Sequence, residues 1–86
     1  MPTRPSQNDP DRVAEWERLR QQVGRRIVLL RIQRGLTQER LALLSGVSRN
    51  VLVNVEHGTR GILYERLFDI AAALEVSVAE LLEDLS

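Results

Sequence analysis

The stretch that decides the fold of this chain is residues 36–58, which read LTQERLALLSGVSRNVLVNVEHG. Thr37 and Ser48 are residue types that cap the start of a helix. Gly46 and Gly58 each follow one of the two capped segments, where a chain leaving a helix favours a residue without a side chain. The stretch therefore predicts two short helices joined by a tight turn, over residues 38–45 and 49–57.

The apolar residues of this stretch indicate which faces are buried. Leu41 and Leu44 are expected to point inward from the first helix, and Leu52 and Val55 from the second. Val47, directly after the turn glycine, is expected to wedge between the two helices. Residues 51–55 are rich in β-branched side chains and in isolation suit a strand. Because a lone strand among helices has no pairing partner, we interpret them as helical.

A long first helix is predicted to precede this stretch. Residues 1–8 are polar, contain two prolines and are expected to form a flexible arm. Asp9 and Pro10 then form a helix start, and only Gly24 interrupts the segment that runs to Arg34. Its apolar stripe, with spacings of three and four residues, consists of Val13, Trp16, Leu19, Val23, Ile27 and Leu30.

Two further helices are predicted to follow it. One runs from Tyr64 to Leu74, with a single face made of Tyr64, Leu67, Phe68, Ala71 and Leu74. The last begins at Ser77, where Glu80 three residues on completes a capping box. The sequence therefore predicts an all-α chain.

Composition narrows the possible functions. The 86 residues are 43% apolar, which fits one domain with a modest core. The chain has no cysteine, one histidine and no glycine-rich phosphate loop, so we expect no enzyme activity, no cofactor and no metal site. No apolar run is long enough to span a membrane, and the N-terminus is too polar for a signal peptide, so we expect a cytoplasmic protein.

Charge is distributed unevenly although the net charge is zero. Residues 1–60 carry 11 arginines and 6 acids, a balance of +5, whereas residues 61–86 carry one arginine and 6 acids, a balance of −5. All 12 basic residues are arginine, whose planar fork can grip phosphate or guanine through two atoms; a GC-rich genome would also explain this usage. The chain therefore has a basic part and an acidic part.

The order of these features resembles the Cro and phage-repressor family of helix-turn-helix regulators, also called the xenobiotic-response-element (XRE) family. The residues that carry the resemblance are Gly24–Ile27, Arg31–Gln38, Leu41-Ala42, Ser45–Arg49, Val55–Gly58, Ile70–Leu74 and Val76–Leu82. The resemblance implies a five-helix, lambda-repressor-like DNA-binding domain over residues 9–86, with an N-terminally extended first helix. Its helix-turn-helix proper spans about 37–57 and its dimerisation region about 61–86.

By this resemblance the chain is a sequence-specific regulator of transcription, a repressor or autoregulator, that binds double-stranded DNA with helix 49–57 in the major groove. The residues implied to face the groove are Ser48, Arg49, Asn50 and Asn54, with Val51 and Val53 placed to meet thymine methyl groups. Gln38 is implied to contact a phosphate or to position the third helix, and Arg60 to contact a phosphate. Glu56 is expected to form an internal ion pair.

A chain this small makes few DNA contacts, so we expect a homodimer. The resemblance extends to restriction–modification controller proteins, which pair through their C-terminal region. The expected interface consists of Ile62, Leu63, Val78, Leu82 and Leu85, although Leu82 and Leu85 would alternatively cover the core. Residues 9–22 would either extend the first helix or fold back through Trp16 and Leu19 onto the body or a second subunit.

Three positions depart from the family pattern. Val53 places an apolar side chain where a polar one is usual, and Gly61-Ile62-Leu63 replaces the usual proline and serine before the fourth helix. Glu75 occupies a helix end that favours glycine.

The alternative function is an antitoxin-like or adaptor protein whose main role is to bind a protein partner.

Overall fold

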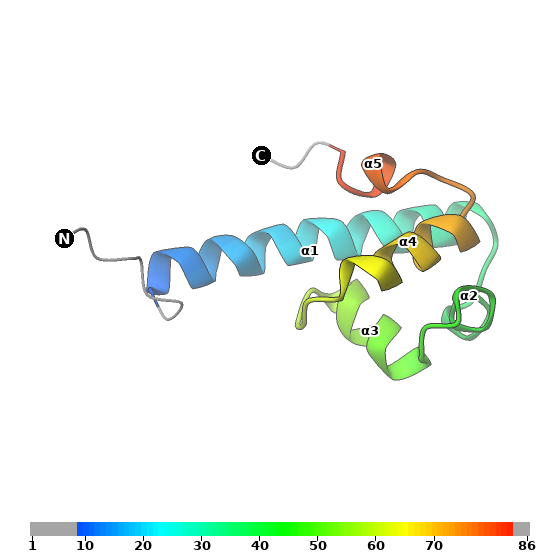
Figure 1. Ribbon diagram of the computed structural model, residues 1–86, viewed down its shortest axis with the longest axis horizontal. Helices are drawn as coiled ribbons and strands as arrows, with labels where there is room; N and C mark the ends of the chain where they lie inside the picture. Colours follow the sequence, from blue (N-terminus) through cyan, green and yellow to red (C-terminus); the bar gives the residue numbers. More distant parts are fainter. Residues whose placement is uncertain (1–8, 84–86) are drawn as a thin grey trace.

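The computed structural model describes residues 9–83, which form five α-helices and no strand (Figure 1). The helices are α1 (Pro10–Gln33), α2 (Gln38–Ser45), α3 (Arg49–His57), α4 (Tyr64–Ala73) and α5 (Val78–Leu81). The all-α prediction is confirmed, and residues 51–55 are helical despite their β-branched side chains. The predicted arm of residues 1–8 and the interface candidate Leu85 lie outside the described residues.

The helix α1 is one continuous helix of 24 residues. At its start the backbone N–H of Asp11 donates to the Asp9 carboxylate at 2.9 Å, and Pro10 occupies the first turn. Residues 9–22 therefore extend the first helix and do not fold back onto the body. Figure 1 shows the N-terminal end of α1 reaching beyond the other four helices.

The turn between α2 and α3 forms as the sequence predicts. Thr37 Oγ1 accepts from the Arg40 N–H at 3.0 Å, and Ser48 Oγ accepts from the Val51 N–H at 3.2 Å. Gly46 has φ 73°, a left-handed conformation that a side chain would strain. The two caps and the left-handed glycine between them define the tight turn that joins α2 to α3.

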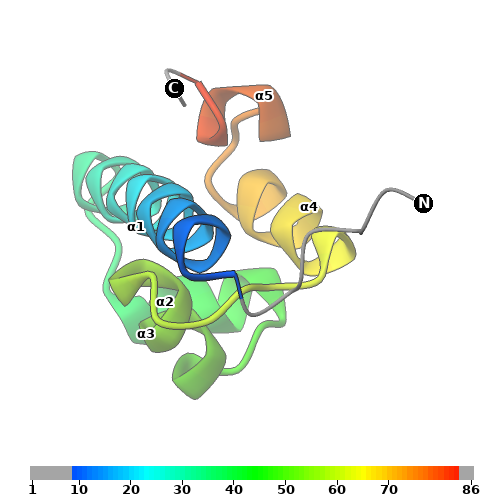
Figure 2. The same ribbon diagram turned by 90° about the vertical axis from the view of Figure 1, so that its left-hand side faces the viewer.

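The core lies where the five helices meet. Its buried apolar residues are Ile27, Leu30, Leu41, Ala42, Val47, Leu52, Val55, Ile70, Ala71, Leu74 and Leu81. Val47 is almost completely buried, as expected for a wedge between α2 and α3. Leu44, however, is exposed, so the inward orientation predicted for it is wrong. Figure 2, which looks along α1 from its N-terminal end, shows α4 and α5 on one side of α1 and α2 and α3 below it.

The apolar face predicted for α4 is only partly buried. Tyr64 is 71% exposed and Phe68 is 56% exposed, whereas Ile70 is completely buried. Each residue advances about 100° around a helix, so Phe68 lies roughly 160° from Ile70 on the helix surface. Burying Ile70 against the core therefore turns Phe68 outward, and Tyr64, one turn earlier, goes with it.

The C-terminal segment is attached to α1. The capping box is confirmed, since Ser77 Oγ accepts from the Glu80 N–H at 3.2 Å and the Glu80 carboxylate accepts from the Ser77 N–H at 3.5 Å. Arg26 of α1 donates to the Glu80 carbonyl at 3.1 Å and to the Glu83 carboxylate at 2.8 Å. Glu75 has φ 59°, the strained left-handed conformation that its position at the end of α4 predicts.

Candidate DNA-recognition surface

The first turn of α3 presents a small group of exposed side chains. Ser48, Arg49, Asn50 and Val51 are all exposed, while Leu52 and Val55 on the opposite face are buried. The helix therefore buries its apolar side and leaves the residues at its N-terminus available for contact. Val53 is half-buried, which reduces the apolar surface that it adds to this face.

Arg49 has one neighbour of opposite charge. Its Nε lies 3.7 Å from a carboxylate oxygen of Glu39 on α2, and both side chains are more than half exposed. An ion pair this long and this exposed contributes little to stability. The guanidinium of Arg49 therefore remains able to exchange Glu39 for another acceptor.

Asn54 differs from Asn50 because its amide is already engaged within the chain. Its Nδ2 donates to the Asn50 carbonyl at 3.0 Å, and Thr59 Oγ1 donates to its Oδ1 at 3.3 Å. The Asn54 carbonyl lies 3.1 Å from the same Oγ1, so the two oxygens of Asn54 share the single hydroxyl proton of Thr59. Asn54 thus fastens the end of α3 to the following loop, a role that the sequence did not indicate.

The buried carboxylate of Glu56, on α3, accepts hydrogen bonds from two other side chains. Glu56 exposes 2% of its side chain and accepts from Arg31 of α1 at 2.7 Å, forming the internal ion pair predicted for it. Gln38 of α2 donates to the same carboxylate at 2.8 Å. Arg31 also donates to the Leu36 carbonyl at 3.0 Å, before α2. This network connects α1 and α2 to α3, and Gln38 takes part in it through its bond to Glu56.

A close helix crossing further fixes α3, and the sequence did not indicate it. A Cβ atom at Gly24 would lie 2.5 Å from the carbonyl oxygens of Val55 and Glu56. Arg20 Nε donates to the Gly58 carbonyl at 3.3 Å, at the end of the same helix. An isolated glycine in a helical segment, such as Gly24, is the sequence signal that could have indicated this close packing.

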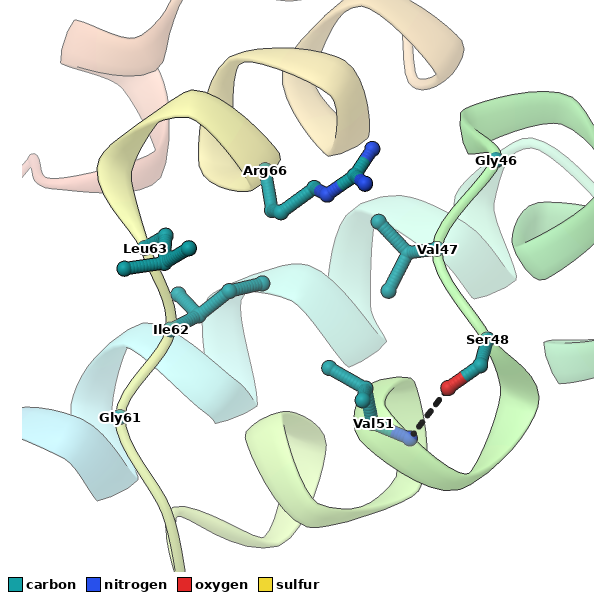
Figure 3. A pocket seen from close by; sticks show the side chains of 8 residues that line it. All are labelled: Gly46, Val47, Ser48, Val51, Gly61, Ile62, Leu63 and Arg66. Carbon is teal, nitrogen blue, oxygen red and sulfur yellow. Dashed lines mark hydrogen bonds between the residues drawn. The ribbon is translucent and has the colours of Figure 1, made fainter.

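A shallow hollow of about 480 Å³ lies beside the first turn of α3 (Figure 3). Val47 and Val51 line one side of it, and Ile62 and Leu63 line the other. The side chain of Arg66 reaches from α4 toward the turn at Gly46 and Val47. Arg66 was not among the predicted site residues, because only the packing of α4 against α2 brings it to this hollow.

Arg60 lies in the loop between α3 and α4. It is exposed and lines a second groove, between α1 and α4, of about 240 Å³. The other lining residues are Leu19, Arg20, Val23, Val55, Gly61, Ile62, Leu67 and Leu82. Arg60 therefore follows the C-terminal end of α3, whereas the exposed predicted base contacts lie at its N-terminal turn.

The predicted interface residues divide into two groups. Leu63 and Leu82 are exposed, whereas Ile62 and Val78 are half-buried and pack against the core. The exposed aromatic pair Tyr64 and Phe68 adds to this surface, with ring centroids 6.3 Å apart in an edge-to-face arrangement. Sequence reasoning missed this pair because it placed both rings on one apolar face of α4 with Leu67, Ala71 and Leu74 and did not separate the exposed residues from the buried ones.

Residues 9–83 contain neither a cluster of metal-binding side chains nor a membrane-spanning helix. There, no three histidine, cysteine, aspartate or glutamate side chains lie close enough together to hold a metal ion. In the same part of the chain, no helix has the length and apolar character that crossing a bilayer requires.

Residues 27–81 match the model of the helix-turn-helix family. The chain belongs to the helix-turn-helix family of transcriptional regulators. A helix-turn-helix transcriptional regulator of Sinorhizobium fredii, y4dJ, is 40% identical over 63 residues, which cover 73% of this chain and 82% of that protein. The match therefore spans most of this regulator and most of its relative.

Solved structures agree with this assignment. The restriction-modification controller protein C.AhdI from Aeromonas hydrophila matches with a TM-score of 0.71 and 37% identity, covering 72% of this chain and 94% of that one. A regulator of the same family from Vibrio cholerae matches with a TM-score of 0.73 and 30% identity, covering 77% of this chain and 37% of that one. The lambda-repressor-like fold predicted for this helix-turn-helix regulator is therefore confirmed.

Proposed function

We propose that this chain reads a specific sequence in double-stranded DNA as a homodimeric transcriptional regulator, a repressor or autoregulator. The observation that carries the proposal is the exposed first turn of α3, Ser48 to Val51, on a helix held from behind by the buried Arg31–Glu56–Gln38 network. A rigid helix with exposed polar side chains at its N-terminus fits the major groove, which is about 12 Å wide.

The proposed base contacts come from the start of this helix. Arg49 would leave Glu39 and donate through two atoms to guanine, and Asn50 would pair with adenine. Val51 would meet a thymine methyl group, with Val53 a weaker contributor because it is half-buried. Asn54 is half-buried and its amide is already bonded to Asn50 and Thr59, which leaves one N–H and one oxygen lone pair for a base, so we rank it below Asn50.

The proposed backbone contacts surround this reading surface. Ser48, at the helix start, and Arg60, after the helix end, would each approach a phosphate. Arg66, at the rim of the hollow beside Val51, is a further phosphate contact on the α4 side. Phosphate contacts of this kind fix the register of the protein on DNA without reading sequence.

The homodimer is proposed to form through the exposed apolar residues of α4 and the α5 end: Leu63, Tyr64, Phe68 and Leu82. Aromatic residues are enriched in protein interfaces. Ile62 and Val78 would support this surface from beneath. The likeness to a protein described as a restriction-modification controller supports a regulatory role for the dimer.

The test is selection of genomic DNA fragments on the purified protein. The wild type should enrich a short symmetric motif, and an Arg49→Ala/Asn50→Ala variant should lose it. Arg25→Ala, which removes an exposed arginine from the outer face of α1, is the control and should enrich the same motif. Enrichment of the same DNA by all three proteins would refute sequence reading by α3, and the antitoxin-like or adaptor alternative, with Tyr64 and Phe68 as its contact surface, would then lead.

A further inference from the structure

The N-terminal end of α1 carries an apolar stripe beyond the body of the protein. We call residues 10–18 the α1 overhang. Val13 and Trp16 follow the same helical spacing as Ile27 and Leu30 of the core, yet they are 39% and 37% exposed. The guanidinium of Arg12 lies 5.2 Å from the centroid of the Trp16 ring and covers part of it. The overhang therefore continues the buried face of α1 past the point where the other helices end (Figure 1).

A groove of complementary character lies beside the overhang. Its walls are apolar and come from α1, α3, the loop before α4, α4 itself and Leu82. Its volume of about 240 Å³ is below the range of about 300–1,000 Å³ usual for small-molecule sites, so it suits a protein side chain better than a cofactor. Its charged lining residues are Arg20 and Arg60, with no acid among the residues that form it.

The overhang and the groove carry opposite charge. The overhang, residues 10–18, contains three acids, Asp11, Glu15 and Glu17, and two arginines, a balance of −1, and Asp9 adds a further carboxylate directly before it. Glu15 accepts from Arg18 at 2.6 Å, and this hydrogen bond keeps the pKa of Glu15 below its ordinary value, so the carboxylate stays charged. An acidic, apolar helix end thus lies on the same chain as a basic, apolar groove.

We propose that in the homodimer the overhang of each copy lies over the groove of its partner, with Trp16 entering the groove. This inference rests on the homodimer of the proposed function. A twofold axis forms both contacts at once, because each copy supplies one overhang and one groove. The pairing is continuous with the proposed interface, since Ile62 and Leu82 line the groove.

The ends of the same chain are less suited to cover the overhang and the groove than a second copy is. Residues 1–8 contain no aromatic or branched aliphatic side chain, and residues 84–86 contain only Leu85. These segments of the same chain offer too little apolar surface to cover both Val13 and Trp16 and the groove. A buried tryptophan supplies about 150–250 Å² of contact, a useful share of the roughly 800 Å² that each partner gives to a stable interface.

The test measures dimer dissociation by sedimentation equilibrium, with circular dichroism to verify the helical fold of each variant. Trp16→Glu should raise the dimer Kd by at least about 30-fold, the effect of removing an interface hot spot. Leu29→Glu, a charge on an exposed leucine of the same helix outside the overhang, is the matched control and should change the Kd by less than about threefold.

Fluorescence provides a second measurement because Trp16 is the single tryptophan of the chain. Emission of the wild type should shift to longer wavelength on dilution, over the concentration range in which sedimentation shows dissociation. A dimer that Phe68→Ser disrupts, but that Trp16→Glu leaves intact and whose emission does not change on dilution, overturns the overhang contact alone. A wild type that is monomeric at every concentration overturns the proposed homodimer itself.

Discussion

The helices α3 and α4 are similar in length and in amphipathic pattern, yet they expose opposite chemistry. The helix α3 has nine residues and α4 has ten, and each buries one apolar face in the same core. The exposed residues of α3 begin with Arg49 and Asn50, whereas those of α4 begin with Tyr64 and include Phe68. Their outer faces, and not their folds, suggest which helix meets DNA and which meets protein.

The two helices also differ in how they are held. The helix α3 is capped by Ser48, ends at Gly58, and is bonded from α1 and α2 through Glu56. The helix α4 has Leu63 at its N-cap and no side-chain cap bond. Base reading needs side chains fixed within a fraction of an ångström, whereas an apolar interface tolerates small shifts. The difference in support therefore matches the difference in proposed role.

The largest expected effect comes from removing the support of α3. Glu56→Ala leaves the Arg31 guanidinium buried without its partner, so we expect a loss of about 3–5 kcal/mol in the free energy of unfolding. Urea denaturation followed by circular dichroism measures it. The double variant Arg31→Met/Glu56→Leu removes both charges and should lose much less. Equal losses in the single and double variants would contradict a buried, coupled pair.

A smaller loss of stability is expected from adding a methyl group at Gly24, where α1 already lies close to α3. Gly24→Ala should gain about 1 kcal/mol from helix propensity alone. Because its Cβ would meet the Val55 and Glu56 carbonyls, we expect instead a net loss of about 2 kcal/mol, with weaker DNA binding. Thermal denaturation checks the sign. Gly61→Ala, where a Cβ meets no atom within 4 Å, is the control and should change stability by less than about 0.5 kcal/mol.

Substitution of the arginines near the two ends of α3 is expected to change DNA binding and not folding. Arg49→Ala should lower the preference for one base pair by about 1–3 kcal/mol. Arg60→Ala should weaken binding to all sequences alike and flatten the slope of log affinity against log salt by about one unit per subunit. Fluorescence anisotropy with a set of altered operators at several salt concentrations separates the two. Identical behaviour of both variants would refute this division, and an affinity loss by Arg60→Ala without a change of slope would place Arg60 in the dimer contact.

The smallest effect on the fold is expected on the outer face of α4. Phe68→Ser removes an exposed ring, so the free energy of unfolding of the monomer should change by less than about 0.5 kcal/mol. The dimer Kd should rise by about tenfold, which corresponds to about 1.4 kcal/mol. Leu43→Ser, at a highly exposed leucine of α2, is the control and should leave the Kd unchanged. Equal Kd values for both variants would move the interface away from α4.

Much of this architecture follows from short-range rules. Thr37, Ser48 and Ser77 cap helices where predicted, because a cap depends only on residues up to three positions away. The left-handed residues Gly46 and Glu75 were also foreseen from local chain geometry. The spacing of Leu41, Leu52 and Val55 located the core side of the two central helices. These signals were sufficient to predict all five helices, while the family was implied by the resemblance of residues 24–82 to known regulators.

Only the tertiary structure decided how the helices meet. The outward rotation of Tyr64 and Phe68 depends on which face of α4 the core accepts, and the spacing of apolar residues fits more than one rotation. The contact of Gly24 with the end of α3, the binding of Gln38 to Glu56 and the position of Arg66 beside the turn join residues far apart in sequence. Local propensity carries no information on such pairs, because their geometry is set by packing of whole helices.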